Sequence, residues 1–209
     1  MKTEKAFVGA RGVDSLPYSI GGTAEQARKL AERGVDFFAG YLGSMNVARL
    51  KFILDAGLAF MPITRAEEYF DGGADEVDRL RALELPKGCT VWLDLEGEKS
   101  YRFDPIELQG LINTWAKTIS AAEYIPGLYV GAPQPLTGPE LARLAVVRYW
   151  KAPSLVLDRN GKDWSEPSGI GWCMYQMWPS LCFRDTDICV DVNIIGEDRR
   201  GRVPSWVVL

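Results

Sequence analysis

The order of segments along the chain predicts an α/β protein: a single, compact (β/α)8 barrel of the TIM type, with helices reduced in its C-terminal third. Eight β-rich runs occur, six of them separated by helix-length connections, and this alternation is typical of parallel βαβ units. The 209 residues reach the lower size limit of this fold, about 200 residues, and no linker divides them, so residues 1–209 are expected to form one domain. An open doubly wound sheet is the alternative, but the first run leads into GVDSLPYSIGG and not into the GxGxxG phosphate loop of that fold.

The N-terminal half is expected to hold four strands and three helices. The first helix has Thr23 as its N-cap and Gln26 three positions later, and Gly34 stops it, as is usual at helix ends. The strands are expected at residues 6–15, 35–42, 58–65 and 90–97, and the helices at 23–33, 46–56 and 74–84.

The C-terminal half is expected to contain more strand than helix. A long helix begins at Pro105 and ends near Glu123. Residues 154–170 are rich in Pro, Gly, Asp and Ser, so we expect a loop where a sixth helix would normally lie. The remaining strands are expected at 124–131, 145–153, 171–179 and 187–195, with a short helix at 138–144.

The composition excludes several classes of function. The chain has no histidine, which excludes Ser-His-Asp and Cys-His nucleophile pairs and every zinc site that uses histidine. Any chemistry must therefore use carboxylates, Lys, Tyr or Cys. Lys and Arg number 24 against 28 Asp and Glu, a net charge of -4, so no positive field attracts nucleic acid or an anionic membrane, and neither partner is expected.

Four cysteines occur without a CxxC pair, so neither a zinc ribbon nor a thioredoxin motif is present. Buried free thiols are one interpretation, and a bond from Cys173 to Cys182 or Cys189 is the other. The chain has no apolar segment of signal-peptide type and no apolar run near 18 residues, so membrane insertion is not expected. We expect a cytoplasmic protein until it is released by lysis, or one that a secretion machine delivers to the cell wall.

Acidic residues lie at the ends of three predicted strands. In the run VWLDLEG (91–97) the apolar residues alternate with Trp92, Asp94 and Glu96, which puts these three side chains on the inward face of a barrel. In DICVDVNII (187–195) the same alternation turns Cys189, Asp191 and Asn193 inward, and Asp14 ends the first strand. Active sites of this fold lie at the C-terminal ends of the strands, where these acids are expected to meet.

Other interpretations of the acids remain open. Asp14 by itself is equally compatible with a helix cap or a turn residue. The group could also form a structural ion network with Arg11, Arg65 or Lys151.

Clustered carboxylates raise one another's pKa, so one can stay protonated as an acid while another stays ionised. This division of labour suits cleavage of a glycosidic bond. Glu96, with the longer stem and nearest the mouth, is the expected acid, and Asp94 is expected to orient and polarise it or the substrate.

Aromatic side chains at or beside the strand ends, Tyr175 among them, suit the flat faces of sugars, although about half are expected to be core or rim packing. The candidate substrate-binding residues are Tyr41, Trp92, Tyr129, Trp150, Gln176, Trp178 and Asn193.

Six motifs in order carry a family resemblance: GVD, WLDLEG, GLYVG, RYWKAP, MYQMW and DVN. From Gly12 to Asn193 the chain resembles the family 25 glycoside hydrolases, the barrel lysozymes. It is similar also to the glycoside hydrolase-like domains of bacterial and phage proteins. The chain departs from the lysozymes in the aliphatic Leu93 and Leu95 and in a C-terminal GRVPSWVVL without a final helix.

The resemblance implies a site as well as a fold. It makes Glu96 the catalytic acid, Asp94 and Asp191 the groups that position water or the acetamido group, and Asp14 a further active-site acid. The implied substrate is the β-1,4 bond between N-acetylmuramic acid and N-acetylglucosamine in peptidoglycan, with no cofactor and no metal.

Two other functions are compatible with the same residues. One is a catalytically silent barrel that binds glycan or cell wall in a phage or secretion apparatus, since function does not follow from fold. The other is a Mg²⁺ or Ca²⁺ site, because hard cations favour oxygen ligands. Its ligands would be Asp14, Asp94, Glu96 and Asp191.

Overall fold

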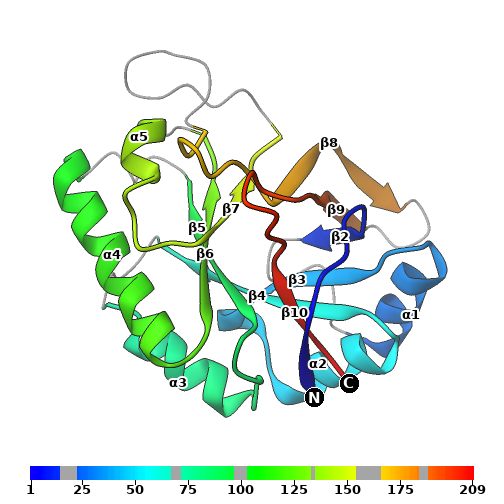
Figure 1. The fold of residues 1–209 in the computed structure, drawn as a ribbon. Coiled ribbons are helices and arrows are strands. Elements are labelled where there is room, and N and C mark those ends of the chain that lie inside the picture. The colour runs from blue at the N-terminus through cyan, green and yellow to red at the C-terminus, as the bar shows by residue number, and fades with distance from the viewer. Residues whose placement is uncertain (15–22, 67–71, 97–102, 133–134, 154–165, 184–187) are drawn as a thin grey trace.

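Eight strands close into a barrel in the computed structural model of the protein (Figure 1). The structure describes residues 1–14, 23–66, 72–96, 103–132, 135–153, 166–183 and 188–209, with backbone alone for 178–183, 188 and 189. The barrel strands are β2 (Arg11–Asp14), β3 (Phe37–Tyr41), β4 (Ala59–Arg65), β5 (Thr90–Leu95), β6 (Ile125–Val130), β7 (Arg148–Lys151), β8 (Met174–Phe183) and β9 (Ile188–Ile195). Neighbours in this order pair with one another, and pairing of β2 with β9 completes the ring.

The barrel is not the all-parallel (β/α)8 arrangement predicted from the sequence. Strands β2 to β8 are parallel to their neighbours, but β9 runs antiparallel to both β8 and β2. The reason is the length of the connection between β8 and β9, residues 184–187. A parallel pair of strands needs a crossover connection of roughly a dozen residues or more. The connection between β8 and β9 is shorter than that, and it therefore allows only an antiparallel hairpin.

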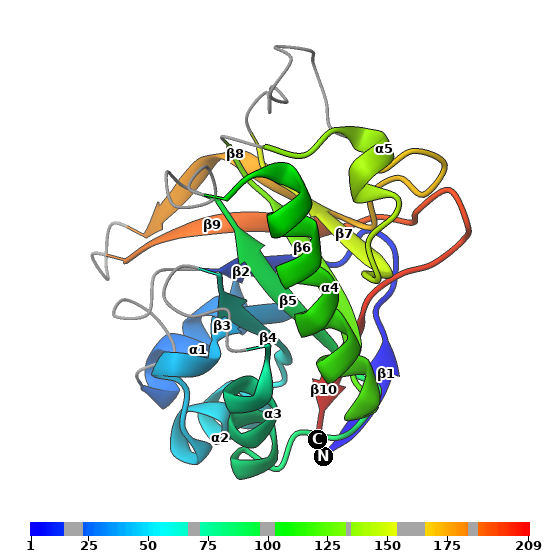
Figure 2. The same ribbon diagram turned by 90° about the vertical axis from the view of Figure 1, so that its left-hand side faces the viewer.

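Helices follow the first five barrel strands and lie around the outside of the barrel (Figures 1 and 2). They are α1 (Ala24–Glu32), α2 (Val47–Asp55), α3 (Ala74–Ala82), α4 (Pro105–Ala121) and the single turn α5 (Gly138–Leu141), with a 3-10 turn η1 (Leu42–Ser44) before α2. The predicted cap is confirmed, because the backbone N–H of Gln26 donates to Thr23 Oγ1 at 3.2 Å. Within the described residues no helix follows β7 or β8, in line with the predicted loss of helices late in the chain.

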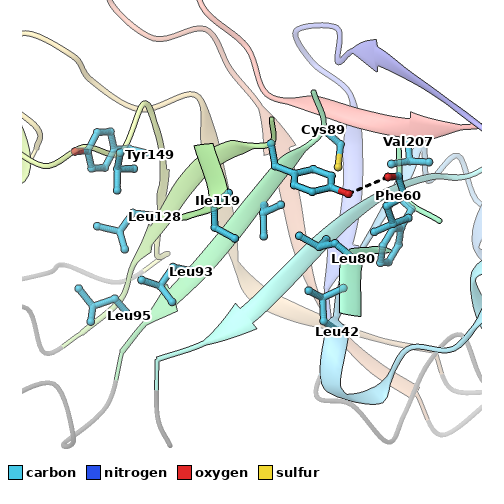
Figure 3. Packing of buried hydrophobic residues seen from close by; sticks show 14 of the residues in the cluster. Leu42, Phe60, Leu80, Cys89, Leu93, Leu95, Ile119, Leu128, Tyr149 and Val207 are labelled. Atoms are coloured by element: carbon cyan, nitrogen blue, oxygen red, sulfur yellow. Dashed lines mark hydrogen bonds between the residues drawn. The ribbon is translucent and has the colours of Figure 1, made fainter. Parts of the chain in front are cut away.

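Two hydrophobic layers lie on opposite faces of the barrel wall. Val91, Leu93 and Leu95 of β5 face outward and belong to the same buried cluster as Ile119 of α4. Figure 3 shows Leu93, Leu95 and Ile119 in this cluster. Trp92, between them in sequence, belongs to the separate cluster that fills the barrel interior. The alternation predicted for VWLDLEG is therefore confirmed, and it turns every second residue of β5 inward.

Two strands outside the barrel were not predicted from the sequence. β1 (Lys2–Lys5) pairs with β10 (Ser205–Val208), and β10 joins β4 through Val207 and Phe60. The predicted strand 6–15 therefore divides into a turn and β2, and GRVPSWVVL forms β10 in place of a helix. The two chain ends lie side by side at the end of the barrel where the parallel strands begin, which we call the closed end (Figure 1).

The bond considered for Cys173 is not formed. Cys89 and Cys173 are buried free thiols, and burial raises the pKa of each to about 12. The backbone register places Cys182 opposite Cys189 on β8 and β9, and their side chains lie outside the described part of the chain. Among the described residues, no helix combines the length and apolar character needed to cross a bilayer.

Candidate active site

The four predicted acids gather where the parallel strands end, which we call the mouth. Asp14 is the last residue of β2, Asp94 lies near the end of β5, and Glu96 follows β5 directly. Asp191 of β9 lies opposite Asp14 in the ladder. Because β9 runs antiparallel, its early residue Asp191 is near the mouth and Asn193 lies deeper, the reverse of their order in a parallel strand.

Asp14 and Asp94 are the buried members of this group, with 6% and 7% of their surfaces exposed. Burial raises the pKa of Asp14 well above its usual range, a hydrogen bond from Asn193 opposes this, and the charges of Asp191, Asp94 and Glu96 add to the rise. The hydrogen bond runs from Asn193 Nδ2 to Asp14 Oδ2 at 2.6 Å. Asp14 thus holds its proton more tightly than an ordinary aspartate. It does not cap α1, whose N-cap is Thr23, and a turn directly after Asp14 lies outside the described residues.

Asp94 is held by a tyrosine from a different strand. The Tyr41 hydroxyl, at the end of β3, donates to Asp94 Oδ2 at 2.9 Å. Burial and the nearby charges of Asp94 and Asp14 raise the pKa of Tyr41, so the phenol stays a hydrogen-bond donor. The Arg65 guanidinium lies 4.8 Å from the centre of the Tyr41 ring, and Arg65 is the register partner of Asp94. Tyr41 therefore positions an acid, in addition to the sugar contact predicted for it.

Of the three cations considered for a structural ion network, the register places only Arg65 beside one of the acids. Arg11 begins β2 at the closed end. Lys151 ends β7, where alternation turns it away from the interior that Trp150 and Ala152 occupy. Of these three cations, Arg65 is therefore the one that the strand register sets beside an acid, at the edge of the mouth.

A second tyrosine spans the barrel just below the acids. The Tyr129 hydroxyl of β6 donates to Gln176 Oε1 of β8 at 2.6 Å. Gln176 is the register partner of Asn193, which bonds Asp14. Burial, followed by the charges of Glu96, Asp94 and Asp14, raises the pKa of Tyr129, which keeps it protonated. Tyr129, Gln176 and Asn193 thus form a polar layer beneath the carboxylates.

Trp92 and Trp150, predicted to bind substrate, are buried in the barrel interior. Trp92 is 0% and Trp150 is 2% exposed, so neither presents a face to a ligand. Their rings pack edge to face at 5.7 Å in the barrel interior, which a small barrel must fill with large side chains. Tyr175 packs on the outer cluster, since alternation turns its neighbour Gln176 inward. The side chain of Trp178 lies outside the described residues.

Sequence reasoning missed Gly131, which follows β6 and lies against Glu96. The signal was its place at a strand end, since glycine there often marks a close approach of another group. In the part of the chain that the structure describes, no group of three or more His, Cys, Asp or Glu side chains is arranged to hold a metal ion.

Comparisons with known proteins relate the chain to others by fold. No family model and no curated protein matches the sequence. An uncharacterized B. stearothermophilus protein superposes with a TM-score of 0.67 at 18% identity, over 90% of this chain and 96% of its own.

Two further solved structures share the fold at low sequence identity. The Clostridium perfringens spore cortex lytic enzyme SleM has a TM-score of 0.57 at 14% identity, over 92% of this chain and 69% of its own. The catalytic domain of the endolysin ply40, from bacteriophage P40 of Listeria monocytogenes, has a TM-score of 0.54 at 18% identity, over 91% and 95%. This chain therefore shares its fold with a spore cortex lytic enzyme and with an endolysin catalytic domain.

Proposed function

We propose that the protein is a glycoside hydrolase of the N-acetylmuramidase type, and that it cleaves peptidoglycan. The observation that carries the proposal is the group of four acids at the mouth, where a buried Asp14 with a raised pKa lies opposite Asp191 and close to Asp94 and Glu96. Its fold, shared with two lytic enzymes, supports the same substrate. As a protein of bacterial or phage origin, it would reach the cell wall by lysis or through a secretion machine.

Each acid has a role that its surroundings suit. Glu96 is the exposed one, so it is placed to protonate the leaving oxygen of a glycosidic bond that enters the mouth. Asp94 is oriented by the Tyr41 hydroxyl and stabilises the positive charge that develops on the sugar ring. Asp191 would position water or the acetamido group of the substrate, while Asp14 holds a proton beneath them.

The proposal is tested by incubating the purified protein with peptidoglycan and measuring new reducing ends. Wild type is expected to release muramic acid ends, and Glu96→Gln to lose activity by about 10²- to 10⁴-fold, the usual contribution of a general acid. Glu32→Gln, at an exposed position on α1, is the matched control and should retain full activity.

A different result would favour another function. A wild-type protein that releases no reducing ends from several peptidoglycans, yet sediments with the insoluble wall, would overturn the hydrolase and leave a glycan-binding barrel. Activity that disappears with a chelator would instead indicate a cation site.

A further inference from the structure

Gly131 lies one residue beyond β6, at the edge of the mouth. It is buried, and its N–H donates to the carbonyl of Leu95 at 3.2 Å, which extends the pairing of β5 and β6 by one step. Leu95 pairs with Val130, so the next residues along the two strands are Glu96 and Gly131. The glycine is thus the neighbour of the proposed catalytic acid.

The side chain of Glu96 occupies the space above this glycine. A methyl group placed on Gly131 would lie 2.5 Å from Glu96 Cβ, 2.7 Å from Glu96 Oε2 and 2.9 Å from Tyr129 Cε1. All three distances are well inside van der Waals contact. Any residue other than glycine would therefore displace the Glu96 carboxylate, the Tyr129 ring or both.

The backbone at this position does not itself require glycine. Gly131 is not among the glycines with a left-handed φ, which include Gly34 and Gly57 at helix ends. Space is therefore the property that glycine supplies here. Elsewhere in the barrel, Gly127 makes room for the buried Trp92 ring, whereas Gly131 makes room for an exposed and charged side chain.

We propose that Gly131 is a positioning residue, one that lets Glu96 lie across the strand end with its carboxylate at the edge of the mouth. The inference rests on the proposed function for its catalytic consequence, while the position of the carboxylate itself can be measured without any substrate.

The first test compares Gly131→Ala with Gly110→Ala, a helical position on α4 where an added methyl meets open space. A displacement of about 1 Å in a catalytic group costs up to about 100-fold, so Gly131→Ala is expected to lower kcat by about 10- to 100-fold with a smaller change in KM. Gly110→Ala should match wild type. In the Glu96→Gln background, Gly131→Ala should cause no further loss, because the acid through which it acts is already absent.

A second test needs no activity. The Glu96 side-chain carboxyl carbon is followed by NMR as pH changes, with its signal assigned by Glu96→Gln. Its titration midpoint is expected to move in Gly131→Ala and to stay in place in Gly110→Ala. A wild type without hydrolase activity would overturn the proposed function alone, whereas an unmoved midpoint together with unchanged kcat would overturn the role of Gly131.

Loss of stability in Gly131→Ala is also informative. If the variant melts early because the methyl group meets Glu96, whose nearest atom is Cβ, then Glu96→Gly/Gly131→Ala should recover most of the melting temperature of Glu96→Gly. A double variant that melts as early as Gly131→Ala would show that another group requires the space, and would overturn the inference.

Discussion

The two ends of the barrel each bury an aspartate, and the two aspartates behave in opposite ways. Asp14 at the mouth is 6% exposed and Asp198 at the closed end is 5% exposed. Burial and three neighbouring acids raise the pKa of Asp14, with one opposing hydrogen bond from a neutral amide. Burial also acts on Asp198, but hydrogen bonds from the Arg202 side chain and from the N–H groups of Arg202 and Arg200 outweigh it and lower the pKa.

The difference is the one expected between a structural site and the active site proposed at the mouth. At the closed end, Asp198 ties one loop together, since Arg202 Nε donates to Asp198 Oδ2 at 2.8 Å and two backbone N–H groups bind Oδ1 at 2.9 Å. At Asp14, by contrast, the charges of three other acids add to the effect of burial, and the hydrogen bond that opposes them comes from a neutral amide. Acids with strongly shifted pKa values concentrate at functional sites. The repulsion among the acids at the mouth therefore favours a catalytic role over a structural one.

The largest effect on stability is expected from removing the ion pair between Arg202 and Asp198 at the closed end. Arg202→Ala leaves Asp198 buried without its cation, so the free energy of unfolding should fall by about 3 kcal/mol, as for other broken buried pairs. Arg200→Ala is the control, since Arg200 contributes only its backbone N–H to Asp198. Urea denaturation measures both, and equal losses in the two variants would contradict the structural role of the ion pair.

A substitution of Asp14 at the mouth is expected to affect activity more than stability. Asp14→Asn removes the buried acid but keeps a partner for Asn193, so activity on peptidoglycan should fall about 100-fold while the fold is retained.

The same variant tests the raised pKa of Asp14. A carboxyl whose pKa is higher in the folded protein destabilises it as pH rises above the unfolded value of about 3.9, until the folded-state pKa is passed. The stability of wild type relative to Asp14→Asn should therefore decline over that range, as followed by urea denaturation from about pH 4 upward. A difference that does not change with pH would mean that the pKa of Asp14 is ordinary. For Asp198, whose pKa is lowered, the stabilisation is present above the unfolded value and is lost as pH falls.

The smallest effects are expected from removing the hydroxyl groups of Tyr41 at the mouth and Tyr124 near the closed end. Tyr41→Phe removes the hydrogen bond to Asp94, and the loss of a bond to a charged group, about 1.5 kcal/mol, should lower kcat about tenfold. Tyr124→Phe removes a bond of 3.1 Å to the Leu85 carbonyl, near the start of β5 and β6, and should cost about 1 kcal/mol of stability with kcat unchanged. Steady-state kinetics and thermal melts on both variants would sharpen the comparison, and a kcat that falls equally in the two would contradict it.

Much of the fold could be predicted because its signals are local. The Thr23 cap, the stop at Gly34 and the alternation around Trp92 depend on neighbours in sequence, and the structure confirms the cap and the alternation. The direction of β9 could not be read from its own residues, because alternation is the same for both directions. The short connection after β8 was the available signal, and weighing its length would have predicted the hairpin.

The sequence by itself determined the alternating order of strands and helices, the inward face of β5 and the presence of acids at the strand ends, since each follows from spacing along the chain. Only the tertiary structure decided that Trp92 and Trp150 fill the interior, that Asp14 is buried beside other acids, and that Gly131 underlies Glu96. Asp14 and Asn193 are 179 positions apart and share a hydrogen bond of 2.6 Å. Desolvation and charge depend on such distances in space, which no linear spacing contains.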